Sequence, residues 1–122
     1  MNTSAPRIVS FREPVEISES QPDAQKLLAG QPRQQIANHY AEASSQFFCG
    51  FWSSTRGKWR VSYTEHELCH ILQGRVAIVA ADGERSEFKA GDTFVVPAGF
   101  SGTWEVLEDC RKVYAIFEPR DA

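Results

Sequence analysis

Long apolar runs, an excess of basic residues and a secretion-type leader are all missing from this sequence, and each absence excludes a class of protein. No apolar run approaches the roughly 20 residues that a membrane-spanning helix requires, and the first residues lack the basic, apolar and small-residue succession of a signal peptide. The formal net charge of -3 gives no electrostatic footprint for nucleic acid or an anionic membrane surface. We therefore expect a cytoplasmic protein that binds neither nucleic acid nor membrane.

Cysteine is scarce as well. The three cysteines, Cys49, Cys69 and Cys110, are odd in number, and each lies in an apolar or strand-like context. Such a pattern does not fit a disulfide framework, so we predict three small buried side chains. A chain of 122 residues, of which 42% are hydrophobic, forms one domain that buries roughly two thirds of its unfolded surface. That is enough for a core with an internal pocket.

Proline is concentrated in residues 1–35, which hold four of the six prolines and cannot form one long regular element. We predict an irregular N-terminal arm over this segment. Within it, residues 7–11 are consistent with a short edge strand. Residues 22–30 are consistent with one or two helical turns, because they begin with proline and end with glycine.

Short runs of β-favouring residues, separated by turn residues, fill residues 36–122 and predict an all-β sandwich or barrel with scarcely a helix. Asp82-Gly83 lies between two such runs and predicts a hairpin with a type I′ turn. Glu108-Asp109 predicts a second hairpin, between residues 103–107 and 111–117. The other predicted strands are 47–52, 58–63, 67–73, 75–81, 84–88 and 93–96.

The predicted strand 47–52 carries apolar side chains on both of its faces, so both faces must be buried against other parts of the protein or a partner. One face suits a barrel interior, and the other requires a sheet or a second subunit. We therefore expect a homodimer whose contact uses this outer face and the N-terminal arm.

The segment 66–70 matches the H-E-x-x-H pattern of zinc proteases, in which two histidines share one face of a helix. Thr64 with Glu67 would cap the start of such a helix, and Gly74 would follow its end. The flanking segments are strand-like, however, and leave almost no linker. In a strand the two histidines lie about 13 Å apart, so they cannot share a zinc ion, and a third ligand is missing. We reject the metalloprotease interpretation and predict a strand.

Two segments resemble the sequence motifs of the cupin superfamily, which forms a small jelly-roll β-barrel. Residues 57–74 begin and end with glycine and carry Glu67 at the position of the motif glutamate, and residues 91–99 read Gly-Asp-Thr-Phe-Val-Val-Pro-Ala-Gly. Residues 67–74 and 104–114 are similar, more narrowly, to the small single-domain cupins related to ureidoglycine aminohydrolase and the ethanolamine-utilisation cupin. The resemblance implies an arm over residues 1–35 and a single-domain cupin barrel over residues 36–122.

Other residues stand where metal-binding cupins carry histidines. Val61, Tyr63 and Gly102 occupy the three positions to which the resemblance assigns histidine ligands, and Glu67 alone keeps an oxygen donor. One carboxylate cannot build a first-row metal site. We predict no metal and no other cofactor, with a divalent metal at an incomplete site as the alternative.

Side chains alternate across a strand, so an inward Glu67 and Cys69 would leave His66 and His70 on the outer face. A carboxyl group among aromatic rings has a raised pKa unless a hydroxyl or a cation pairs with it. It can serve as a general acid or base, or it can bind an amine or amide. Glu67 is accordingly the predicted catalytic residue. The register implied by the resemblance predicts a ligand-binding pocket that consists of Trp59, Tyr63, Glu67, Cys69, Trp104 and Tyr114.

These observations predict a cupin-fold protein that binds a small-molecule ligand in its barrel. Two alternatives stay open: an enzyme on a small nitrogenous metabolite, similar to ureidoglycine aminohydrolase, and a non-catalytic dimer for ligand sensing or structure. A second titratable group beside Glu67 would favour the enzyme, and Tyr63 and Cys69 are the candidates that the sequence offers.

Overall fold

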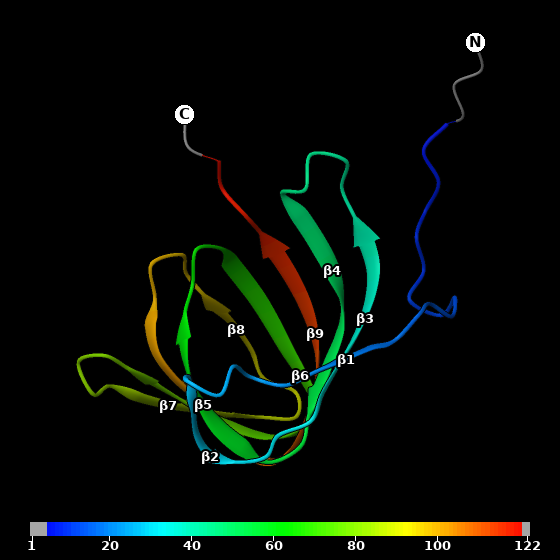
Figure 1. The fold of residues 1–122 in the computed structure, drawn as a ribbon. Coiled ribbons are helices and arrows are strands. Elements are labelled where there is room, and N and C mark those ends of the chain that lie inside the picture. Colours follow the sequence, from blue (N-terminus) through cyan, green and yellow to red (C-terminus); the bar gives the residue numbers. More distant parts are fainter. Residues whose placement is uncertain (1–4, 121–122) are drawn as a thin grey trace.

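The computed structural model describes residues 5–120 and contains nine strands and no helix in that range (Figure 1). The all-β prediction is confirmed, and within the same range no helix suited to crossing a membrane occurs. Residues 1–4 of the predicted arm and 121–122 of the predicted barrel lie outside the described residues. The strands are β1 (Ser18–Ser20), β2 (Leu27–Gly30), β3 (Gln34–Ala41), β4 (Phe47–Ser54), β5 (Gly57–Ser62), β6 (His66–Ala80), β7 (Arg85–Lys89), β8 (Thr93–Val96) and β9 (Ser101–Phe117).

Strands β6 and β9 form the central pair of the fold and run antiparallel along their whole length. The first half of β6 also pairs with β8, and the second half pairs with β7. In β9, residues 101–106 pair with β5 and residues 110–117 pair with β4. Because each long strand has different neighbours along its two halves, the sheet curls around one interior, as a jelly-roll barrel does (Figure 1).

The predicted hairpin across Glu108-Asp109 is wrong, since β9 continues through these residues. The register between β6 and β9 shifts there instead, and Gly74 of β6 lies opposite with a φ of 88°. A Cβ on Gly74 would overlap the carbonyl oxygen of Asp109, so glycine allows both the positive φ and the close approach. The strands predicted at 67–73 and 75–81 are accordingly one strand with an irregularity at Gly74.

The Asp82-Gly83 turn joins β6 to β7, as predicted, but not with type I′ geometry. Gly83 has a φ of 95°, whereas Asp82 is not among the residues with positive φ. The Gly83 N–H donates to the Ala80 carbonyl at 2.9 Å, which is the pattern of a type I turn followed by a glycine in the left-handed region. This turn spares Asp82 the left-handed conformation that non-glycine residues avoid.

Two strands of the N-terminal arm join the two ends of the curled sheet: β1 pairs with β3, and β2 pairs with β5. The edge strand predicted at 7–11 is wrong, because these residues form no strand. Of the one or two helical turns predicted at 22–30, one is present, because the N–H groups of Lys26 and Leu27 donate to the Asp23 carbonyl. The prediction is wrong for residues 27–30, which form β2. Both edges of the barrel offer unpaired backbone groups, and pairing with them outweighs the local preferences of the arm.

The outer face of β4 is covered from within the chain. Phe51 points to this face, where the Phe11 ring lies edge-on at 5.3 Å between ring centroids and stacks on His39 at 4.5 Å. The Arg111 guanidinium lies 4.1 Å from the centroid of the Phe51 ring. The arm therefore supplies part of the cover that the apolar sequence of β4 requires, and it does so through Phe11.

Candidate functional site

The first half of β6 alternates between a buried and an exposed face. Glu67, Cys69 and Ile71 are buried, whereas His66 is exposed and accepts a hydrogen bond from the Ala98 N–H. His70 points the same way as His66 and pairs with the Thr93 hydroxyl at 2.7 Å. The segment is a strand, so the metalloprotease interpretation stays excluded, and the predicted orientation of the two histidines is confirmed.

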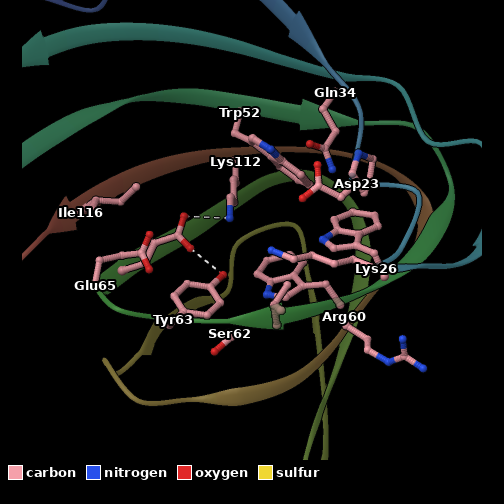
Figure 2. Close-up of a pocket in the computed structure, with 15 residues that line it drawn as sticks. Asp23, Lys26, Gln34, Trp52, Arg60, Ser62, Tyr63, Glu65, Lys112 and Ile116 are labelled. Carbon is pink, nitrogen blue, oxygen red and sulfur yellow. Dashed lines mark hydrogen bonds and ion pairs between the residues drawn. The ribbon is translucent and has the colours of Figure 1, made fainter.

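A pocket of about 380 Å³ opens into the barrel interior on the buried face of β6 (Figure 2). Its walls are aromatic: Trp52 comes from β4, Trp59 from β5 and Trp104 from β9, with Tyr63 just after β5. Trp52 lies edge-on to Trp104, with 5.9 Å between ring centroids. We call this cavity the main pocket. Its more exposed rim carries polar and charged residues, namely Asp23, Lys26, Gln34, Arg60, Ser62 and Glu65.

Glu67 lies at the bottom of the main pocket between two donors. The Tyr63 hydroxyl donates to Glu67 Oε1 at 2.9 Å, and Lys112 Nζ donates to Oε2 at 2.9 Å (Figure 2). Glu67 is 6% exposed and Lys112 is 4% exposed, so the two charges form a buried ion pair. A hydroxyl and a cation, the two partners expected for a carboxyl group among aromatic rings, are thus both present.

Lys112 was not predicted from the sequence, although it is the second titratable group of the site. Its register partners Trp52 on β4 and Ile71 on β6 both face the interior, which places Lys112 inside as well. The sequence did contain a clue, because Lys112 lies two residues before Tyr114 and residues two apart in a strand share a face. That signal could be used only once the register of the last strand was known.

Two indole rings and a thiol complete the surroundings of the Lys112 ammonium. Its Nζ lies 4.2 Å from the centroid of the Trp104 ring and 4.6 Å from that of Trp52, distances at which a cation is attracted to a ring face. Cys69 Sγ lies 3.5 Å away. The ammonium is therefore enclosed on several sides by groups of the protein.

These contacts determine the protonation states of the site. Burial alone would lower the pKa of Lys112, but the Glu67 carboxylate and the Cys69 sulfur outweigh it, so the pKa lies above its ordinary value. Burial and the negative charge of Glu67 raise the pKa of Tyr63 well above its ordinary value. Burial also raises the pKa of Cys69 to about 12, although Lys112 counteracts it. At neutral pH the site holds an ammonium, a neutral phenol and a neutral thiol, so neither Lys112 nor Cys69 is a ready nucleophile.

One hydrogen-bond donor in this region has no partner. Among residues 5–120, no atom accepts a hydrogen bond of acceptable geometry from the buried indole N–H of Trp104, although this N–H is close enough to the Tyr63 hydroxyl to oppose the rise in its pKa. A buried donor without an acceptor is costly. The nitrogen is itself shielded from solvent, so it is a strained polar group in the wall of the interior and not an open donor in the main pocket.

The structure brings four of the six predicted pocket residues together, since Trp59, Tyr63, Glu67 and Trp104 all line the main pocket. Cys69 does not line it, because its side chain is fully buried behind Lys112. Tyr114 lies in a neighbouring cavity of about 240 Å³, which we call the second chamber. This chamber is lined by Ile36, Asn38, Phe48, Trp52, Glu67, Tyr114 and Ile116.

The residues present do not fit a divalent metal. The three positions that carry histidine ligands in metal-binding cupins are Val61, Tyr63 and Gly102 here, and none of them is a histidine. Residues 5–120 contain no group of three acidic, histidine or cysteine side chains that could hold an ion. A Cβ on Gly102 would overlap the Val79 carbonyl oxygen, so this position cannot carry a larger side chain without rearrangement. Both oxygens of Glu67 are engaged, one by the Tyr63 hydroxyl and one by the Lys112 ammonium.

Comparison with protein families matches residues 41–114 to the EutQ-like cupin domain. Among solved structures, a DUF861 protein of unknown function from Pseudomonas syringae pv. tomato is 26% identical, with a TM-score of 0.77, over 88% of this chain and 46% of that one. EutQ from Clostridium difficile is 17% identical, with a TM-score of 0.64, over 71% of this chain and 64% of that one. The chain thus spans less than two thirds of either protein.

A putative ethanolamine utilization protein Q from Salmonella typhimurium is also 17% identical, with a TM-score of 0.64, over 88% of this chain and all of that one. At this identity the likeness shows the fold alone. The comparison with curated proteins found no match.

Proposed function

The chain belongs to the EutQ-like cupin family, and from that premise we propose that its barrel binds a small neutral metabolite without the help of a metal ion. One observation carries the proposal: the buried Glu67–Lys112 pair, with the Tyr63 hydroxyl beside it, at the bottom of an aromatic pocket. A buried ion pair contributes little stability by itself. Its location in a pocket is better explained by ligand binding.

The charge balance of the site selects the charge of the ligand. Glu67 and Lys112 neutralise each other at 2.9 Å, so a ligand with net charge would bring an unpaired charge into a buried region, which is unfavourable. A neutral polar group meets no such penalty. We therefore expect a neutral head group in the main pocket.

The hydrogen-bonding groups and the walls narrow the ligand further. Lys112 lines the main pocket, and only two of the three donors of its ammonium are used, by Glu67 and Cys69. The third donor calls for an acceptor oxygen, whereas the Glu67 carboxylate has lone pairs that an N–H group can use. An amide or a ureide carries both kinds of group on one planar unit. Planar groups also pack well against the face of an indole ring such as that of Trp52 or Trp59. An amide or ureide compound is the ligand class that fits best.

Isothermal titration calorimetry with three compounds of similar size tests the proposal. N-methylurea is neutral, acetate is an anion and methylammonium is a cation. We expect the wild type to bind N-methylurea in preference to both ions, and we expect Glu67→Gln to weaken that binding at least tenfold. Glu84→Gln is the matched control, because Glu84 lies in the exposed turn before β7. Equal binding of the three compounds, or no effect of Glu67→Gln, would refute the proposal.

Catalysis on the same class of compound is a second candidate, favoured by the protonated Lys112 beside Glu67. An ammonium and a carboxylate in one pocket can act as general acid and general base. Ammonia release from ureides, measured for the wild type and Glu67→Gln, separates the two functions. Turnover that falls in the variant supports an enzyme, whereas binding without turnover supports a ligand-binding domain.

We also propose a homodimer. Beyond the part that Phe11 covers, the outer face of the barrel exposes Leu68 (45%), Val95 (56%) and Phe117 (47%). Leu68 and Val95 are direct cross-strand partners, so the exposed apolar area is continuous across β6 and β8, and such patches commonly mark interfaces. Light scattering should give twice the chain mass for the wild type and a lower mass for Leu68→Glu. A monomeric wild type at micromolar concentration would contradict this proposal.

A further inference from the structure

We infer that the ligand carries an apolar substituent and that this substituent lies in the second chamber while the polar head occupies the main pocket. The inference rests on the proposed function and adds to it the shape and chemical class of the ligand. Trp52, Glu67 and Ile116 line both cavities. A molecule whose head contacts Glu67 therefore meets the second chamber immediately beside it.

Gly50 allows the backbone of β3 to pack closely against β4 beside the second chamber. On the inner face of β4 it lies between Phe48 and Trp52, and its cross-strand partners are Asn38 on β3 and Tyr114 on β9. A Cβ on Gly50 would overlap the Ala37 carbonyl oxygen, so this position carries no side chain. The Tyr114 hydroxyl reaches across to Asn38 Oδ1 at 2.6 Å.

The polar groups of the second chamber are already engaged. Tyr114 donates to Asn38 Oδ1, and Asn38 Nδ2 donates to the Tyr40 carbonyl at 3.1 Å. The other wall residues that this chamber does not share with the main pocket are Ile36 and Phe48, which are apolar and half-buried. A chamber of this kind favours hydrocarbon, because water inside it gains few hydrogen bonds.

The ligand class that follows is an amide or urea with an alkyl substituent on nitrogen. Each methylene buried in the second chamber should strengthen binding about fourfold, since burial of one methylene contributes about 0.8 kcal/mol. The gain should stop when the chain outgrows the chamber. A compound with only a polar head would use the main pocket alone and bind weakly.

Titration calorimetry with N-methyl-, N-ethyl-, N-propyl- and N-butylurea tests this inference. The wild type should show the fourfold gain per methylene along the series. Ile36 lines the second chamber and does not line the main pocket, so Ile36→Phe should bind N-methylurea as the wild type does and lose most of the gain with chain length. Glu84→Phe, which adds a ring in the exposed turn before β7, is the control and should preserve the gain. Phe48→Trp is a second chamber-narrowing variant, for use if Ile36→Phe does not fold.

The outcomes separate this inference from the proposed function. Equal affinities along the series in the wild type, or an undiminished gain in both chamber variants, would overturn the two-chamber inference while the proposed function stands. Binding of no compound by the wild type, or binding that Glu67→Gln leaves unchanged, would overturn the proposed function and this inference with it.

Discussion

Removing one member of the Glu67–Lys112 pair should destabilise the protein far more than removing both charges. Glu67→Gln leaves a buried ammonium without its counter-charge, since an amide oxygen can accept a hydrogen bond but carries no negative charge, and Lys112→Met leaves a buried carboxylate with only the Tyr63 hydroxyl. Breaking a buried pair on one side costs about 3–5 kcal/mol. The double variant Glu67→Gln/Lys112→Met keeps an acceptor for Tyr63 and buries no charge, so its unfolding free energy should lie within about 1 kcal/mol of the wild type or above it.

Chemical denaturation measures these differences directly. Trp52 and Trp104 flank Lys112, so their fluorescence reports the loss of packing around the pair. For a chain of 122 residues, each kcal/mol corresponds to about 4 °C in melting temperature, and the single variants should therefore melt roughly 12–20 °C below the wild type. The double variant should melt close to the wild type and yet fail to bind N-methylurea. Single variants that cost less than about 1 kcal/mol, or a double variant that costs the sum of both, would refute the account of the pair.

Three further predictions follow from burial and packing. With a thiol reagent at pH 8, the folded protein should react at no cysteine other than Cys49. Cys69 and Cys110 are 0% and 3% exposed, and burial raises their pKa values to about 12 and about 11. Rapid labelling of all three thiols before unfolding would contradict this prediction. Because the pKa of Lys112 is raised in the folded state, its contribution to stability is complete below its ordinary pKa of 10.5 and is lost as the pH rises through the higher folded value. As the pH rises above 10.5, the urea concentration at the unfolding midpoint should fall more for the wild type than for Glu67→Gln/Lys112→Met. An equal fall in the two proteins would contradict a raised pKa for Lys112. Gly102→Ala should lower the unfolding free energy by about 1–3 kcal/mol, because its Cβ meets the Val79 carbonyl; a melting temperature equal to that of the exposed control Ser101→Ala would show that the site accommodates a methyl group.

The orientation of β6 was predictable because the cupin motif assigns Glu67 to the interior and side chains alternate along a strand. Apolarity alone would not have given it, since Leu68 and Leu72 lie on the outer face. The aromatic residues of the cupin motifs supply the walls around Glu67. Local information was sufficient here, since both the alternation and the motif spacing lie within one strand and its neighbours.

Lys112 was not predictable in the same way. It follows the charged run at Glu108 and Asp109, which predicts an exposed turn, and its partner Glu67 lies 45 residues away in the chain. A buried cation is compatible with the fold only when its counter-ion is in place, and this pairing depends on the register between β6 and β9. The register itself shifts near Gly74, so the pattern of residues alone could not supply it.

The arm failed to follow its local preferences for a similar reason. Residues 22–30 carry the proline and glycine signals of a short helix, but β2 forms because the edge of β5 lies beside it. That edge exists only in the folded barrel. The same contact brings Asp23 and Lys26 to the rim of the main pocket, which the sequence did not indicate.

The central claim is that Lys112 supplies the positive charge of this barrel in place of a metal ion, and calorimetry on metal-stripped protein tests it most directly. N-methylurea is titrated into wild-type protein treated with a chelator and then into the same protein with manganese or zinc added. The account predicts equal affinity in both conditions, with binding lost in Lys112→Met regardless of metal. Binding that appears only after metal is added, and that persists in Lys112→Met, would contradict it.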